Sequence, residues 1–408
     1  MPARWLIAFA VFLAAQAASG AHAYSQLPLL AALYVLYAVL MIWLGAQLTA
    51  AFGIERVAIA LAAFLLAVSA LAATFAVPWL NDVLHLGLPG EGTLDRILAS
   101  PGEHAEPRRQ AWLVALRVFA GAPLAGVGTG EFAGAAFELG LDPSLTRLGE
   151  VWTSPHNLPL HLLAETGLVG TVLALGGLCA WWAQAARRYR TDRQVTSWWI
   201  IAAVGIEMIH SMTEFPLWNA HFLGVTTLLI GAGARLETRS PAASHTGWIT
   251  PAAACVVLSA TLGITLRDYL RLDVTRISGT TITLTPAAQA HQDADTMREL
   301  THGLMAPLAE LWIVIGAPLD RSNLASKLAM SERVARCWPA NTVVARRAVF
   351  LAFDGQAEKA RSLLARALGT FPHQLNATIL ILEQARAADP GAIEPLLAIA
   401  RPASGLRK

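Results

Sequence analysis

Long apolar runs with few charges dominate this sequence and limit what the chain can fold into. A helix needs about 20 mostly apolar residues to cross the roughly 30 Å hydrocarbon layer of a bilayer. Seven segments approach or reach that length: Trp5–Ala21, Leu27–Leu48, Val57–Leu80, Leu158–Ala185, Ser197–Ser211, Leu217–Ala234 and Trp248–Leu266. Only 14% of the residues are charged, against about 25% in soluble domains. The sequence therefore predicts an all-α, polytopic membrane protein with about seven transmembrane helices, and it excludes a soluble enzyme.

The first apolar segment allows two interpretations. Arg4, the apolar stretch and Ala21-His22-Ala23 also fit a secretory signal peptide with a small-residue cleavage site. The alternative is a retained membrane span. Under both interpretations, Tyr24 lies on the outer side of the membrane.

Basic residues in the loops predict the orientation of the chain, because short cytoplasmic loops collect lysine and arginine. The arginines that mark these loops are Arg56, Arg187, Arg188, Arg190, Arg193, Arg235 and Arg239. The predicted organisation is three N-terminal transmembrane helices in 1–80, an outer loop with an amphipathic or re-entrant segment in 81–157, four further spans in 158–266, and an outer domain in 267–408.

The last part of the chain is charged throughout and has helical periodicity. In 357–372, apolar residues recur along one helix face: Ala360, Leu363, Leu364, Ala367, Leu368 and Phe371. Gly355 precedes this stretch and Pro372 ends it. The layout is that of one half of a tetratricopeptide hairpin, so 267–408 is predicted to form helical hairpins of that kind.

Two groups of polar residues lie at predicted membrane depth, where ionisable side chains are costly and indicate function. The first follows Pro155 at the outer mouth of the fourth span and contains His156, Asn157, His161 and Glu165. The second lies near the outer end of the fifth span, with one histidine in the next: Glu207, His210, Ser211, Glu214 and His221. Two structural alternatives stay open, namely a simple His161–Glu165 pair between packed helices and a hydrated His156 at a helix mouth.

Other chemistries receive little support from the residues. The histidines and carboxylates lack the tight spacing of common zinc motifs, and Cys179, Cys255 and Cys337 are too scattered for a zinc site or a disulfide framework. A net charge of +2 gives no basic field for nucleic acid. The glycines of Gly126–Gly130 resemble a nucleotide loop, but no strand and helix flank them, so they indicate a tight turn that re-enters the membrane.

Among the five arginines of the predicted outer loop, three lie close together in the sequence: Arg108, Arg109 and Arg117. One interpretation is a solvated amphipathic helix. The other is a guanidinium clamp on phosphate, because the rigid fork of arginine suits bidentate contact with phosphate oxygens.

These pieces, in this order, resemble the O-antigen ligase family, and most closely its pilin O-oligosaccharyltransferase branch. The features that carry the resemblance are R-x-x-x-W at Arg108 and Trp112, PLAGVGTGEF at Pro123–Phe132, PHNLPLHLLAETGLVG at Pro155–Gly170, and HSMTEFPLWNAHFL at His210–Leu223. The most specific part is H-N-x-x-L-x-x-L-x-E-x-G-L-x-G, which begins at His156.

The resemblance implies a bacterial inner-membrane glycosyltransferase whose active site and C-terminal domain face the periplasm. Such an enzyme moves a whole glycan from undecaprenyl pyrophosphate to a hydroxyl, on a protein such as pilin or on lipid A–core, and no metal or other cofactor is implied. By match to the motif, His156 is the expected base and Asn157 holds the local geometry. The expected pyrophosphate ligands are Arg108, Arg109 and Arg117, and His161, Glu165, Glu207, His210 and Glu214 form the supporting polar cluster.

Two differences from the family pattern affect these expectations. Family members usually have more N-terminal spans, so this chain is expected to be a shortened member. An S-G-S-R-T-like patch of the family corresponds here to Ser19–Ala23, with His22 where an arginine is expected. The alternatives are therefore a glycan polymerase of the same superfamily, an inactive paralogue that acts as a scaffold, and a transporter that uses the buried His and Glu residues as a proton relay.

Overall fold

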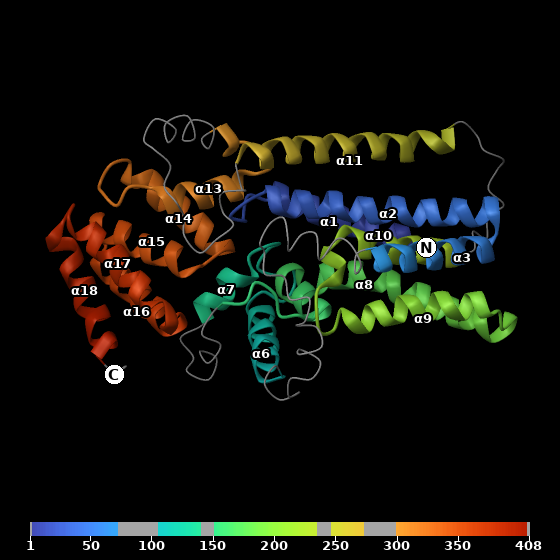
Figure 1. Ribbon diagram of the computed structural model, residues 1–408, viewed down its shortest axis with the longest axis horizontal. Coiled ribbons are helices and arrows are strands. Elements are labelled where there is room, and N and C mark those ends of the chain that lie inside the picture. The colour runs from blue at the N-terminus through green and yellow to red at the C-terminus, as the bar shows by residue number, and fades with distance from the viewer. Residues whose placement is uncertain (1, 72–104, 140–150, 235–245, 273–298, 406–408) are drawn as a thin grey trace.

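The computed structural model describes residues 2–71, 105–139, 151–234, 246–272 and 299–405 (Figure 1). Within these ranges every regular element is a helix, which confirms the predicted all-α fold. Residues 72–80 of the third predicted span, and Arg235 and Arg239 of a predicted loop, lie outside the described residues.

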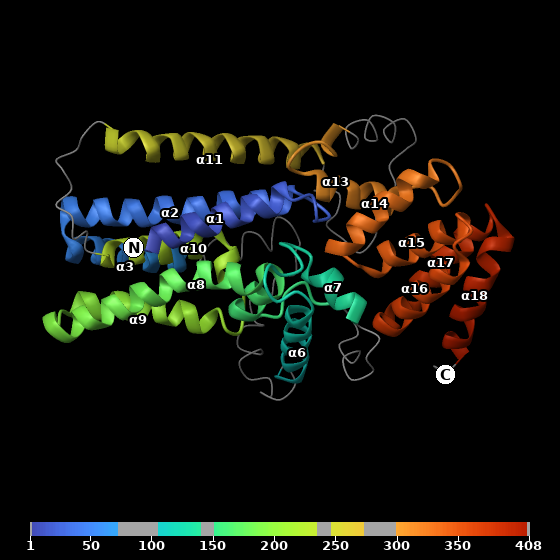
Figure 2. The same cartoon turned by 180° about the vertical axis from the view of Figure 1, so that it is seen from behind.

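The described membrane part contains long helices that lie side by side along the longest axis of the molecule (Figures 1 and 2). They are α1 (Pro2–Ala18), α2 (Gln26–Phe52), α3 (Ile54–Leu71), α8 (Leu158–Asp192), α9 (Val195–His210), α10 (Ala220–Gly233) and α11 (Thr246–Arg271). Helix α6 (Ala105–Gly121) runs across the direction of the bundle, and the short helix α7 (Phe132–Leu139) lies between the bundle and the C-terminal helices.

Three helices are long and apolar enough to cross a membrane by length and composition: α2, α8 and α11. The predicted spans at α1, α9 and α10 are also apolar helices, but they are shorter, with 17, 16 and 14 residues. A membrane-embedded helical protein is thus supported, while the number of seven spans and the orientation of the chain remain predictions.

Glycines bring α2 and α10 into close contact. A Cβ atom on Gly45 would lie 2.1 Å from the carbonyl oxygen of Leu228, and one on Gly231 would lie 2.0 Å from that of Ile42. Only glycine fits at both positions without a shift of backbone. Small residues allow such approach between helices in a membrane, where packing replaces the hydrophobic effect as the driving force.

The segment 186–196, between the predicted fourth and fifth spans, is mostly helical, so the helix of the fourth span extends beyond its expected end at Ala185. Helix α8 continues through the arginines of this segment to Asp192 and ends where Arg193 adopts a left-handed backbone conformation with φ of 52°. No glycine or proline interrupts the segment, and alanine and arginine both favour helix. The connection to α9 is therefore much shorter than predicted.

The C-terminal domain consists of helical hairpins, as predicted. Its helices are α13 (Ala306–Gly316), α14 (Leu324–Cys337), α15 (Asn341–Phe353), α16 (Ala357–Thr370), α17 (Leu375–Arg386) and α18 (Pro390–Gly405). The apolar stripe predicted on 357–372 is the buried face of α16, where Leu364 and Ala367 are fully buried against α15 and α18. This domain lies at one end of the molecule, next to α7 (Figure 1).

Candidate active site

One carboxylate joins an arginine of α6 to a histidine just before α8. Glu214 Oε1 lies 2.6 Å from Nη2 of Arg108, and Glu214 Oε2 lies 3.0 Å from Nδ1 of His156. The three side chains are 26% to 40% exposed, so this cluster is open to a substrate. We refer to Arg108, His156 and Glu214 as the histidine cluster.

The backbone of His156 is held in an uncommon conformation. Its φ is 50°, in the left-handed region that non-glycine residues rarely adopt. Its N–H donates to Oγ of Ser154 at 3.2 Å, and the carbonyl of Pro155 accepts from Nε1 of Trp112 at 2.9 Å. Such strained positions persist only where the surroundings impose them, and they concentrate at functional sites.

These contacts explain the R-x-x-x-W spacing of Arg108 and Trp112. Arg108 and Trp112 are one helical turn apart on α6, and they contact Glu214 and Pro155, respectively. Helix α6 therefore supports the histidine both through its carboxylate partner and through the preceding backbone.

Asn157 is the N-cap of α8. Its Oδ1 accepts from the N–H of Leu160 at 3.1 Å, and its Nδ2 donates to the carbonyl of Met212 at 3.2 Å. The N–H of Leu158 donates to the carbonyl of Ser211 at 2.8 Å. Asn157 thus joins the start of α8 to the segment that carries Glu214.

Aromatic rings flank the imidazole of His156 on two sides. Trp152 and Phe215 meet it edge to face, with ring centroids at 5.0 and 4.9 Å. In the tautomer with the proton on Nδ1, His156 donates to Glu214 and its Nε2 is left as the acceptor. A histidine held in this tautomer can take a proton from a hydroxyl.

Helix α8 is broken at Gly167, and the predicted turn packs into the break. Gly167 has φ of 62° and ψ of −167°. The amides of Val127 and Gly128 donate to the carbonyls of Ala164 and Glu165 at 2.9 and 3.0 Å. Beyond the break, Leu168 and Val169 donate to the carbonyls of Pro123 and Leu124 at 2.8 and 3.2 Å, respectively.

The segment that contains the Gly126–Gly130 turn and the broken helix α8 therefore hydrogen-bond each other's backbone N–H and C=O groups. A Cβ atom on Gly126 would lie 2.2 Å from the carbonyl carbon of Glu165, which explains the need for glycine there. Gln16 of α1 covers the turn, because its Nε2 donates to the carbonyl of Ala125 and its Oε1 accepts from Thr129. Non-helical backbone at membrane depth is tolerated only where protein covers it in this way.

His161 and Glu165 form a buried pair. Nε2 of His161 lies 3.2 Å from Oε2 of Glu165, and the side chains are 6% and 8% exposed. Trp218 meets the His161 ring edge to face at 4.8 Å. The structure thus places these two residues in the packed interior, in line with the structural alternative left open by the sequence.

A cavity of about 260 Å³ lies between α1, α2, α8 and α10. Its lining is mainly apolar and includes Leu13, Val35, Leu162 and Ile230, with His161 and Glu165 among the few polar residues. The cavity is thus suited to an apolar chain beside the buried pair.

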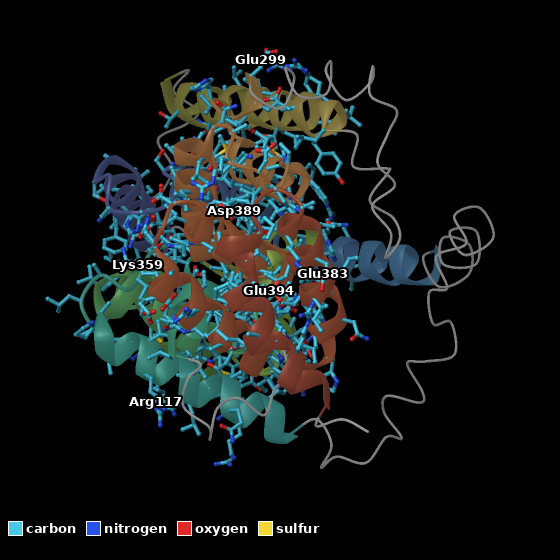
Figure 3. All side chains as sticks on the ribbon, turned by 90° about the vertical axis from the view of Figure 1, so that its left-hand side faces the viewer. Arg117, Glu299, Lys359, Glu383, Asp389 and Glu394 are labelled. Atoms are coloured by element: carbon cyan, nitrogen blue, oxygen red, sulfur yellow. The ribbon has the colours of Figure 1, made fainter. Side chains whose placement is uncertain are left out.

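The remaining predicted site residues include Arg109 and Arg117 on α6, and Glu207 and His210 on α9. Arg109 is exposed, and Arg117 projects from α6 at the outer edge of the molecule (Figure 3). His210 is exposed against Phe222, and Glu207 lies one turn before it on α9, partly buried. Of the second predicted group, Glu214 alone contacts His156 among the described residues.

His22 lies against the glycine turn. Its Nδ1 is 3.6 Å from Oε1 of Glu131, and a Cβ atom on Gly128 would lie 2.2 Å from the same nitrogen. The position where an arginine was expected is therefore beside the turn, and the neighbouring side chain of Glu131 is 6% exposed. Glu131 was missed by the sequence reasoning, because a single acid after a glycine run carries no signal of burial.

No group of three or more histidine, cysteine or acidic side chains within the described ranges is arranged to hold a metal ion.

Comparison with known families gives two matches. Residues 9–175 match the family model described as "O-Antigen ligase", and residues 198–382 match the model described as "Virulence factor membrane-bound polymerase, C-terminal". The first match contains Arg108 and His156, and the second contains Glu214 and α14 to α16. No curated protein and no solved structure matches the chain.

Proposed function

We propose that this chain, a member of the O-antigen ligase superfamily, moves a glycan en bloc from undecaprenyl pyrophosphate to a hydroxyl. The proposed acceptor is a serine or threonine of a protein such as pilin, and lipid A–core is the alternative. The proposed site faces the periplasm from the bacterial inner membrane. The observation that carries this proposal is the contact of 3.0 Å between His156 and Glu214 beside Arg108.

In the proposed reaction, Nε2 of His156 takes the proton of the acceptor hydroxyl. The oxygen then attacks the anomeric carbon of the first sugar, and the bond from that carbon to the pyrophosphate oxygen breaks. Glu214 holds the imidazole in the required tautomer and stabilises the imidazolium that forms. The displaced electron pair leaves with the pyrophosphate.

Arg108 is proposed to stabilise the charge of the leaving pyrophosphate. A guanidinium has five N–H donors, and the contact with Glu214 at 2.6 Å engages one of its nitrogens. Fixed positive charge near the position where negative charge develops is a large contribution to catalysis. Asn157 keeps the start of α8, and therefore His156, in place.

The match to the polymerase model supports a second candidate, in which the acceptor hydroxyl belongs to another lipid-linked glycan. The chemistry at His156 would be the same, because both reactions join an activated sugar to a hydroxyl. Only the acceptor differs. An inactive scaffold is the remaining alternative, based on His22 in place of an expected arginine.

The test uses a membrane preparation that contains the full chain, lipid-linked glycan, and one acceptor at a time. With pilin as the acceptor, the product is a glycosylated protein. With lipid A–core it is extended lipopolysaccharide, and with lipid-linked glycan alone it is a longer lipid-linked chain. His156→Ala should lower transfer by about 10²- to 10⁴-fold at equal protein amount, the usual magnitude of general-base catalysis. His161→Ala should instead reduce the yield of folded protein. Transfer at the parent rate by His156→Ala would show that His156 is not the base.

A further inference from the structure

We propose that Glu131 is a positioning residue through which the C-terminal domain holds the glycine turn and the first half of α8 in the geometry required for transfer. This inference rests on the proposed function. It concerns a residue between the turn and α7 that does not contact the histidine cluster among the described residues.

Glu131 joins three distant parts of the chain. Its Oε2 accepts from Nε and Nη2 of Arg336 on α14, at 3.0 and 2.6 Å. Its Oε1 accepts from the N–H of Ala23, between α1 and α2, at 2.7 Å. Arg336 also donates from Nη2 to the carbonyl of Ala21 at 3.1 Å. We refer to this arrangement as the Glu131 clamp.

The carboxylate depends on the arginine of the C-terminal domain. The Glu131 side chain is 6% exposed, whereas that of Arg336 is 44% exposed. A buried carboxylate is strongly destabilising once its cationic partner is removed. His22 lies at 3.6 Å, too far for a direct hydrogen bond with Glu131, so it does not replace the arginine.

A continuous set of contacts leads from the clamp to the start of α8. The N–H of Glu131 donates to the carbonyl of Gly128 at 3.1 Å, and the turn donates to the carbonyls of Ala164 and Glu165. The N–H of Phe132 also approaches Oε1 of Glu165 at 3.4 Å. This half of α8 begins at the cap Asn157, next to His156. A shift of Glu131 would therefore move the start of α8, which directly follows the proposed base His156.

A second clamp on the same helix provides a matched control. Glu310 of α13 accepts from Nε and Nη2 of Arg333 at 3.0 and 2.6 Å, and it accepts from the hydroxyl of Tyr24 at 2.8 Å. Burial and the Glu310 carboxylate raise the pKa of Tyr24, so its hydroxyl stays a donor. The Glu310 side chain is 8% exposed and that of Arg333 is 39% exposed, close to the values of the Glu131 clamp. Within the described part of the chain, Glu310, Arg333 and Tyr24 form no hydrogen bond with the Gly126–Gly130 turn.

The experiment compares Arg336→Ala with Arg333→Ala in the full chain in detergent micelles with lipid-linked glycan. Each variant removes an arginine of α14 that pairs with a buried carboxylate elsewhere in the chain, so both should lower the melting temperature. Arg336→Ala should also lower kcat per folded protein by about 10²-fold, the expected effect of a misplacement of about 1 Å, with little change in KM for the donor. Arg333→Ala should keep kcat near the parent value. Glu131→Gln and Glu310→Gln repeat the comparison with smaller changes, in case the alanine variants do not fold.

Two further readouts separate positioning from loss of stability. Millimolar guanidinium, which can occupy the space left by the side chain, should restore kcat of Arg336→Ala. Hydrogen exchange should increase in 123–130 and 158–166 for Arg336→Ala and not for Arg333→Ala. Equal kcat and equal exchange in the two variants would overturn the inference. If the parent protein transfers no glycan, the proposed function fails, while the exchange comparison still tests the clamp.

Discussion

Replacement of Glu214 by glutamine tests the chemistry of the histidine cluster most directly. The change keeps the size of the side chain and an oxygen that can accept from Nδ1 of His156, but it removes the negative charge. Two opposite charges about 4 Å apart attract by about 4 kcal/mol at an effective dielectric constant of about 20. The contact here is 3.0 Å between atoms, and the side chains are 26% and 40% exposed, so solvent screens much of that energy.

A remaining stabilisation of the imidazolium of about 1.4 to 2.7 kcal/mol corresponds to about a 10- to 100-fold loss of kcat. Initial rates of glycan transfer at saturating donor, with protein amount fixed by size-exclusion profile, measure this loss. The matched control is Glu207→Gln, on α9 and away from His156. A parent-like rate for Glu214→Gln would refute the role of its charge, and a loss as large as that of His156→Ala would mean that Glu214 does more than assist the histidine.

Three further predictions concern the leaving group, the turn and the C-terminal domain. Arg108→Lys keeps the charge but loses the planar guanidinium fork, so it should raise KM for the lipid-linked donor. Arg117→Lys, at the outer edge of α6, is the control and should leave this KM unchanged. Equal KM values for the two variants would contradict a phosphate-binding role of Arg108. Gly126→Ala places a Cβ atom 2.2 Å from the backbone of α8 at φ of 73°, and crowding together with left-handed strain should cost about 2 to 5 kcal/mol. Gly121→Ala, with no atom within 4 Å, is its control, and thermal unfolding in detergent measures both. Hydrogen bonds from Lys327 and Ser322 lower the pKa of Asp320 from 3.8 to about 2. The ionised Asp320 therefore stabilises the fold above pH 3.8, and this contribution is lost as the pH falls toward about 2. Asp320→Asn should make the free energy of unfolding depend less on pH between about 2 and 3.8. An unchanged pH dependence would show that Asp320 does not contribute this stability.

The membrane character and the helical hairpins could be predicted from the sequence, because both depend on local patterns. Apolar runs identify the helices of the bundle, and the stripe on 357–372 identifies the buried face of α16. The end of α8 could not be predicted from charge alone. Clustered arginines indicate a cytoplasmic segment, but arginine also has a high helix propensity, and α8 extends through these arginines to Asp192.

His156, Arg108 and Glu214 could be predicted as site residues from the sequence, but the contacts of the site could be predicted only between neighbours in sequence. His156 and Asn157 stand in one motif and perform adjacent tasks at one helix start. Glu214 lies 58 residues away from His156, and Arg336 lies 205 residues away from Glu131. Such pairs are set by the packing of several helices, and no periodicity along one segment reports them.

The break in α8 has a consequence for how the protein is made. Four backbone groups around Gly167 obtain their partners from 123–128 rather than from α8 itself. In lipid these groups would stay unsatisfied at a cost of several kcal/mol each until the turn docks. The turn precedes α8 in the chain, so the ribosome has already released it when α8 enters the bilayer. The turn is therefore synthesised before the helix that needs it, and the backbone groups at the break in α8 can find their partners while α8 inserts.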